Sequence, residues 1–177
     1  MSKGIAIHWF RQDLRITDNP SLETAAEFDA VLPIYILDDG NSQEFKMGSA
    51  SRWWLYNSLQ SLNESLDGKL SIYNQNPKIV IQELLEKYEV KAVFWNRCYE
   101  PWRIDRDIDI KAYLDDKNIE NKSFNSHLLW EPWEISKDDG TPYRVFTPYY
   151  KKGCLNAEEP RLPSKNLKID TIFYDLD

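Results

Sequence analysis

Four charged residues follow a short apolar run near the start of the chain, namely Arg11, Asp13, Arg15 and Asp18. Guanidinium and carboxylate groups in one loop either pair with each other or bind a polar or planar ligand. Both interpretations stay open for this cluster. We expect Asp13, Arg15 and Asp18 to form a structural network. Arg11 and its neighbour Phe10 lie closer to the apolar run, and a ligand-binding role is as well supported for them as a structural one.

The apolar run predicts a buried strand, and similar runs alternate with helical patterns along the chain. The predicted strands are Gly4–Phe10, Val31–Leu37, Leu70–Tyr73, Ala92–Trp95 and Ile119–Phe124. Helices are expected at about 19–28, 49–67, 77–88 and 103–117. Alternating strands and helices with short loops favour an α/β fold. We predict a Rossmann-like, doubly wound, five-stranded parallel sheet of order 3-2-1-4-5 with helices on both faces.

Several details of these elements are also predicted. Asn19 or Asp18 before Pro20 is typical of a helix start, Ser49 could cap the second helix, and Gly68 could end it. A turn is expected at Asp39–Gly40. Because adjacent helical residues point apart, we expect at least one of the two tryptophans that follow Arg52 to pack inward. Residues 171–177 are expected to trail off.

Composition excludes several kinds of function. The 177 residues are 42% hydrophobic and 14% aromatic. The net charge of −7 disfavours DNA binding by this chain alone. The six glycines form neither GxGxxG nor a P-loop, and Cys98 and Cys154 have no metal-ligand spacing. His8 is expected to be packed within its strand. We therefore predict no catalytic residues and no metal site.

The sequence shows no signal peptide and no membrane span at its ends or interior, and its few cysteines suit a reducing compartment. The expected location is therefore the cytoplasm, with no membrane partner.

Four segments resemble the DNA photolyase and cryptochrome family in order and spacing. They are WFRxDLRxxDNPxL from Trp9, GxASRWWL from Gly48, WNRCYEP from Trp95 and GTPYRVFTPYY from Gly140. Together they span almost the whole chain. In that family an N-terminal α/β domain carries a light-harvesting antenna chromophore. A helical domain that follows it binds FAD and repairs pyrimidine dimers in DNA.

The resemblance implies that residues 1–130 are the antenna-binding domain and residues 131–177 an extension and interdomain linker. The helical FAD domain is expected to be absent, so FAD, damaged DNA and dimer-splitting lyase activity belong to a parent protein. The parent's helical domain is then the expected partner. The chain alone should not repair DNA.

The expected chromophore-binding residues lie at the ends of the first and fourth strands and at the start of the second helix. They are Phe10, Arg11, Arg52, Asn96, Glu100 and Arg103. Folate antenna sites in the family have an Asn-Glu pair where this chain has Trp102-Arg103, which favours a deazaflavin or flavin over a folate. Two alternatives remain: the same domain of a cryptochrome photoreceptor, or a generic nucleotide-binding or interaction module.

Overall fold

The computed structural model describes residues 3–38, 46–164 and 171–174, which belong to two compact units. The first unit holds the described residues up to Ser126 and again from Ser164 onward, and the second is His127–Pro163. These units differ from the predicted segments 1–130 and 131–177 because the end of the chain packs with the first unit. The turn expected at Asp39–Gly40 lies outside the described residues.

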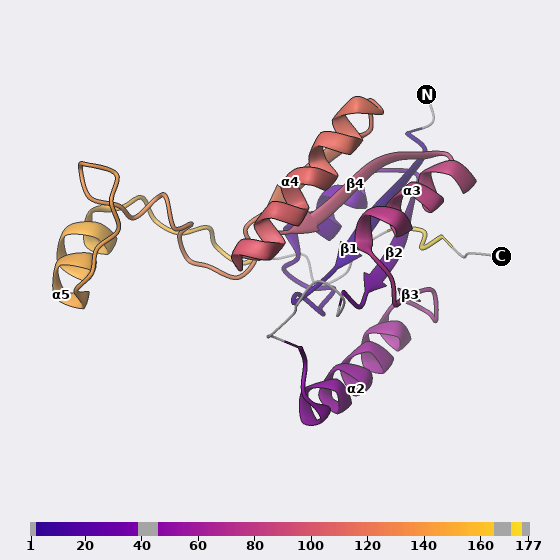
Figure 1. Cartoon of the computed structure of the whole chain (residues 1–177), viewed down its shortest axis with the longest axis horizontal. Coiled ribbons are helices and arrows are strands. Elements are labelled where there is room, and N and C mark those ends of the chain that lie inside the picture. Colours follow the sequence, from indigo (N-terminus) through magenta and orange to yellow (C-terminus); the bar gives the residue numbers. More distant parts are fainter. Residues whose placement is uncertain (1–2, 39–45, 165–170, 175–177) are drawn as a thin grey trace. The chain divides into compact units, whose positions relative to one another are not determined.

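The first unit is built on a five-stranded parallel sheet (Figure 1). Its strands are β1 (Ile5–Phe10), β2 (Ala30–Ile36), β3 (Ser71–Tyr73), β4 (Val90–Asn96) and β5 (Glu120–Phe124). Their order is β3-β2-β1-β4-β5, which confirms the predicted fold class. The central strands β1, β2 and β4 are almost continuously apolar because helices cover both of their faces.

Two hydrophobic clusters, one on each face, show that the sheet is doubly wound. The covering helices are α1 (Pro20–Ala25), α2 (Ser49–Ser65), α3 (Pro77–Lys87) and α4 (Pro101–Asp116). Side chains of α3 and α4, such as Ile81 and Ile110, pack in one cluster. Those of α1 and α2, such as Leu22 and Leu62, pack in the other. Helix α4 begins two residues earlier than predicted because Pro101 suits the first helical position.

The helix ends follow local capping rules, with one correction. The Asn19 side chain accepts a hydrogen bond from the Leu22 N–H at 3.2 Å, which confirms the predicted cap of α1. The expected Ser49 cap is wrong, since Gly48 occupies the N-cap of α2 and Ser49 is its first helical residue. Gly68 adopts a φ of 81° beyond the end of α2 and donates its N–H to the Asn63 carbonyl at 2.8 Å.

The pleat of β1 separates its last two aromatic side chains. Trp9 packs with the α3 and α4 cluster, and its ring centroid lies 5.9 Å from that of Trp95 on β4. Phe10 points to the other face and packs with the α1 and α2 cluster. The alternation of the strand therefore places Trp9 and Phe10 on opposite faces of the sheet.

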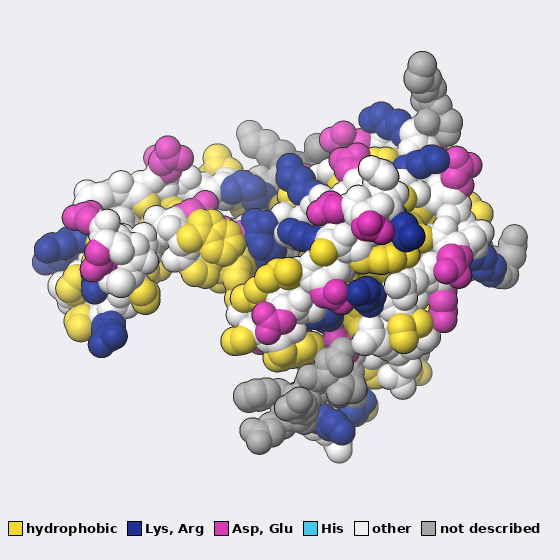
Figure 2. Space-filling view, turned by 45° about the horizontal axis from the view of Figure 1, so that its top comes forward, with side chains coloured by type: hydrophobic (Ala, Val, Ile, Leu, Met, Phe, Trp, Pro, Cys, Tyr) yellow, Lys and Arg dark blue, Asp and Glu magenta, His cyan; other side chains and the backbone are white. Residues whose placement is uncertain are grey.

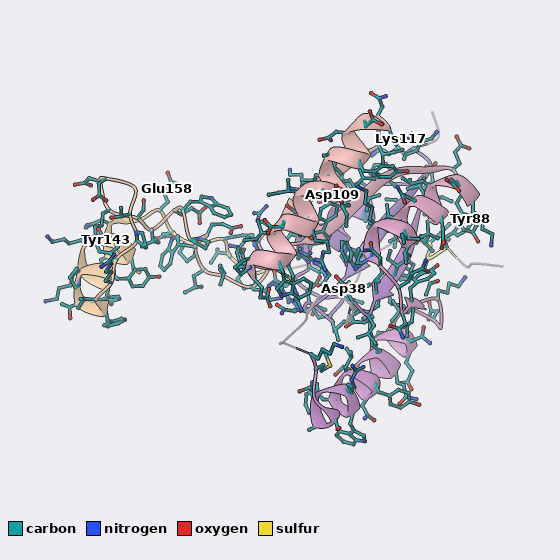
Figure 3. All side chains as sticks on the ribbon, in the orientation of Figure 1. Asp38, Tyr88, Asp109, Lys117, Tyr143 and Glu158 are labelled. Carbon is teal, nitrogen blue, oxygen red and sulfur yellow. The ribbon has the colours of Figure 1, made fainter. Side chains whose placement is uncertain are left out.

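Residues 171–174 pair with the sheet, which corrects the expectation that the chain trails off there. Phe173 forms a parallel bridge with Val31, whose N–H donates to the Ile172 carbonyl at 2.8 Å. Tyr174 meets the ring of Tyr88 edge-on at 5.7 Å, beside the position labelled in Figure 3. The short strand β3 pairs only with the second half of β2, which leaves the first half available for this bridge.

The second unit is mostly irregular. It contains α5 (Phe146–Pro148), a π-helix (Tyr149–Gly153) and a 3-10 turn (Cys154–Asn156). Gly153 is required by close packing, since a Cβ there would lie 2.7 Å from Cγ2 of Ile135. The Trp130 indole donates to the Glu158 carbonyl at 2.8 Å. This unit therefore holds itself together by a few local contacts.

Basic and acidic side chains are interspersed over the face seen in Figure 2. Among the described residues, no helix combines the length and apolar character needed to cross a membrane. The same residues contain no group of three or more His, Cys, Asp or Glu side chains that could hold a metal ion.

Candidate functional site

A cavity of about 820 Å³ opens at the carboxyl ends of β1 and β2, in the first unit. This is the edge at which open α/β sheets bind their ligands. Its walls come from the ends of these strands and from the first turns of α2 and α4. The lining residues are Trp9, Arg11, Gln12, Leu14, Tyr35, Ile36, Leu37, Asp38, Met47, Ala50, Ser51, Trp54, Leu55, Glu100, Pro101, Trp102, Arg103 and Arg106.

Indole rings and guanidinium groups alternate along one wall of the cavity. The Arg106 guanidinium lies 4.7 Å from the Trp9 ring centroid and 5.5 Å from that of Trp102. Arg103 lies 4.9 Å from the Trp102 ring, and Arg11 lies 5.1 Å from the Trp9 ring. These cation–π contacts fix flat surfaces at the cavity wall, and such surfaces suit a planar ligand.

A chain of four alternating charges lies beneath this wall. Asp38, labelled in Figure 3, pairs with Arg106 at 2.9 Å, and Arg106 also pairs with Asp107 at 2.8 Å. Asp107 then accepts two hydrogen bonds from Arg11 Nη1, at 2.9 and 2.7 Å. Each of these side chains is at most 11% exposed. Because the charges compensate each other, the chain of ion pairs is a rigid base and carries no excess charge of its own.

Arg103 keeps unused donor capacity at the cavity. Its Nη1 contacts the Cys98 Sγ at 3.3 Å and the Glu100 carboxylate at 3.5 Å. Its Nε is buried and has no hydrogen-bond partner among the described residues, and the same is true of the Trp9 Nε1. Buried donors of this kind cost free energy unless a ligand or water satisfies them. Arg103 is therefore suited to bind an acceptor group of a ligand.

Three of the six predicted site residues line the cavity, and three do not. Arg11, Glu100 and Arg103 come together there from the residue after β1, the N-cap of α4 and the first turn of α4. Phe10 and Asn96 are fully buried, because the pleat turns both toward the α1 side of the sheet. Arg52 does not line the cavity and instead donates its Nε to the Met47 carbonyl at 3.2 Å.

Trp9, Asp38 and Arg106 also line the cavity but were not predicted as site residues, although their positions in the sequence could have indicated them. Arg11 directly follows β1, and Trp9 is two residues before it, so the alternation of the strand points to Trp9 in place of Phe10 on the side of Arg11. Asp38 follows directly on the predicted second strand, at the same edge of the sheet. Arg106 is at helical spacing from Arg103, so both face the same side of α4.

The expectation that Trp53 or Trp54 packs inward is wrong, because they are 68% and 71% exposed. The buried face of α2 is formed by leucines farther along the helix, chiefly Leu59 and Leu62. Trp54 instead lines the cavity and offers it a further aromatic surface.

A buried polar cluster supports the base of the opening loop. His8 is buried as predicted, with its Nδ1 2.9 Å from the Ser21 hydroxyl, and burial lowers the pKa of His8 to about 4 although Asp13 opposes this shift. Burial raises the pKa of Asp13, but His8, the Arg11 N–H and the Asn96 amide outweigh it and hold this pKa below its usual value. At neutral pH the cluster therefore holds a neutral imidazole and a charged carboxylate.

The comparisons with known proteins agree with this fold. The sequence profile described as DNA photolyase matches residues 6–166. The chain is 38% identical over 154 residues to Cryptochrome-2 of Arabidopsis thaliana, covering 85% of this chain and 25% of the relative. It is 34% identical over 162 residues to the deoxyribodipyrimidine photo-lyase of Agrobacterium fabrum, covering 89% of this chain and 33% of the relative.

Solved structures give the same result. A bacterial class III photolyase from Agrobacterium tumefaciens superposes with a TM-score of 0.82 at 31% identity, over 100% of this chain and 37% of that one. An archaeal photolyase from Sulfolobus tokodaii, at 24% identity, shares the fold with a TM-score of 0.71 over 97% of this chain and 38% of that one. The chain thus spans a quarter to two fifths of these relatives. Together with the sheet order and the cavity, this coverage shows that the chain belongs to the DNA photolyase and cryptochrome family and corresponds to its N-terminal α/β domain.

Proposed function

We propose that this domain binds a planar antenna chromophore in the cavity and gathers blue light for a flavin held elsewhere in a longer protein. The observation that carries the proposal is the cavity itself, about 820 Å³ in volume and walled by indole rings. Its size lies within the range that holds cofactor-sized ligands. The role that we propose for the chain at this site is to bind and position a ligand.

The residues present fit a flavin or deazaflavin. Trp54 and Trp102 would offer the flat surfaces, and Arg103 would donate to an acceptor on the ring system or on its side chain. When bound, such a group would absorb blue light and pass the excitation energy onward. We favour it over a folate because Trp102 and Arg103 stand where the family's folate sites have Asn and Glu. The archaeal photolyase with the same fold is described as holding two FAD molecules, with the implication of a novel light-harvesting cofactor.

The test is to incubate the purified chain separately with a deazaflavin, FMN, FAD, a reduced folate and ATP, and then to remove unbound ligand. We expect the absorption spectrum to show a retained deazaflavin or flavin at a ratio near one per chain. Retention of the folate alone would contradict the chromophore assignment. Binding of ATP with no chromophore retained would support a generic nucleotide-binding module instead.

We further propose that a helical FAD-binding domain of the parent protein is the partner of this domain. The support is the set of large side chains exposed on α2 and in the second unit, including Trp53, Trp133 and Phe146. DNA would then be reached only through the parent, and the chain alone would not repair it. Mixing the chain with a separately produced helical domain of the parent should give a complex, whereas Trp53→Ser should weaken it.

A cryptochrome remains the second candidate, because a cryptochrome and a photolyase are both similar to this chain at more than 30% identity. The cavity does not separate the two, since dimer repair would depend on the parent's other domain. Light-dependent repair of pyrimidine dimers by the full-length parent would favour a photolyase. Its absence in a parent that still binds FAD would favour a photoreceptor.

A further inference from the structure

The loop between β1 and α1 is fixed to the core by its inner residues. The Asp13 carboxylate accepts hydrogen bonds from the Asn96 amide at 2.6 Å and from the Asn19 amide at 3.1 Å. The Asn96 amide also donates to Asn19 Oδ1 at 2.7 Å. These three side chains are fully or almost fully buried. The loop therefore presents its outer residues, Arg15 and Asp18, from a rigid base.

The outer residues hold two distant points of the chain. Arg15 Nη2 donates to the Ser126 carbonyl at 2.9 Å, and the same nitrogen donates to the Asp18 carbonyl at 2.8 Å. Asp18 Oδ1 in turn accepts the Ser164 N–H at 2.9 Å. The two side chains also face each other, with Arg15 Nη2 3.9 Å from Asp18 Oδ2. Ser126 and Ser164 are thus held by adjacent groups of one loop.

Ser126 and Ser164 are the residues at which the chain leaves the first unit and returns to it. We propose that Arg15 and Asp18 form a clasp that holds Ser126 and Ser164 together, the two first-unit residues between which the segment His127–Pro163 is inserted. The clasp is independent of the chromophore cavity, because neither Arg15 nor Asp18 lines that cavity. It assigns these two charges of the opening motif to holding together the two first-unit residues between which the second unit is inserted.

The backbone at Asp18 explains why an aspartate occupies this position. Its φ is 48°, in the left-handed region that Asp, Asn and Gly tolerate best. Of these three residues, Asp and Asn also offer a side-chain oxygen to the Ser164 N–H, and Asp adds a negative charge beside Arg15. Asp18 therefore combines a left-handed backbone conformation with a side-chain oxygen that accepts a hydrogen bond. Substitutions can remove the oxygen and keep the backbone conformation.

The decisive comparison is between Asp18→Gly and Asp18→Asn. Both replacements tolerate the left-handed backbone, but only Asn keeps an oxygen that can accept the Ser164 N–H. Amide hydrogen exchange at Ser164 should become about tenfold faster in Asp18→Gly and stay near the original rate in Asp18→Asn. Asp67→Gly is the matched control, since Asp67 is also left-handed, with a φ of 55°, but is exposed at the end of α2. It should leave Ser164 exchange unchanged.

Limited proteolysis gives a second readout that does not depend on the Asp18 variants. Arg161 is exposed and lies just before Ser164, so trypsin reports how freely this part of the chain moves. We expect Arg15→Met to raise the rate of cleavage after Arg161 severalfold, with an unchanged midpoint of thermal unfolding for the first unit. An unchanged cleavage rate in Arg15→Met would overturn the clasp. Equal Ser164 exchange in Asp18→Gly and Asp18→Asn would also overturn it.

Discussion

Asp107 has the largest number of charged contacts at the candidate site. It accepts hydrogen bonds from Arg11 and Arg106 and also from the Trp95 indole at 3.0 Å. The charge of this one carboxylate thus allows two guanidinium groups to be buried under the cavity wall. The indole contact in addition fixes the packing of Trp95 against Trp9, whose ring forms part of that wall.

Replacing Asp107 with Asn should destabilise the domain strongly. The substitution leaves the buried Arg11 guanidinium without its counter-charge, which costs about 3 kcal/mol or more of unfolding free energy. Asp109→Asn is the control on the same helix, labelled in Figure 3, because its pair with Lys78 is largely exposed and contributes less than about 1 kcal/mol. Urea unfolding of both variants measures the difference, and equal losses would contradict a buried ionic base.

The His8 and Asp13 pair predicts a pH dependence of stability. The pKa of His8 lies near 4 in the folded domain and near 6.5 when unfolded, so the unfolded chain binds more protons between these values. The unfolding free energy should therefore fall as the pH drops from about 6.5 to 4, by roughly 3 kcal/mol in full. The lowered pKa of Asp13 adds a further loss below about pH 4.

The matching variant is His8→Gln, whose side chain does not titrate. Its unfolding free energy should change little between pH 6.5 and 4, in contrast to that of the original chain. Chemical denaturation at a series of pH values gives both curves. Parallel curves for the two proteins would show that His8 is not the group responsible.

At the scale of elements, α2 joins the core to the candidate site. Its leucines pack on the sheet, whereas its first turn lines the cavity and its two tryptophans are exposed. The helix therefore needs its buried face for stability, and its other faces are those that we propose to bind the chromophore and the partner domain. This division explains why so many large apolar side chains of α2 remain at the surface.

The two faces of α2 should respond differently to truncation. Leu62→Ala removes a buried side chain from the cluster on the α1 side and should cost about 2–5 kcal/mol of unfolding free energy. Trp53→Ala removes a larger but exposed side chain and should change stability by less than about 1 kcal/mol. Thermal or urea unfolding compares them. A larger loss for Trp53→Ala would mean that α2 packs through its other face.

Much of the fold was predictable from the sequence because it depends on local patterns. The apolar runs, the Asn19 cap and the prolines at helix starts determine the element order with little tertiary information. The site was predictable only in part. Arg11, Glu100 and Arg103 could be predicted because they lie near the ends of strands. Placing Trp9 at the cavity requires knowledge of the pleat of β1. Trp54 is exposed because leucines elsewhere on α2 form the buried face of that helix.

At the scale of the whole molecule, the chain consists of an α/β unit and a second compact unit, His127–Pro163. The first unit contains the sheet, the ionic base and the cavity. In the opening motif Arg11 supports the cavity wall, while Arg15 and Asp18 hold Ser126 and Ser164, the first-unit residues on either side of the second unit.

The most direct test of this account is the dissociation constant of the best-retained flavin or deazaflavin, measured by its fluorescence in the 177-residue chain and in two tryptophan variants. Ala50 lines the cavity, so the indole of Ala50→Trp should occupy part of it and weaken binding at least about tenfold. Gln60 lies on the same helix but does not line the cavity, so Gln60→Trp should bind as the original chain does. Binding that Ala50→Trp leaves unchanged, or no binding by the original chain, would contradict the assignment of this cavity as the chromophore site.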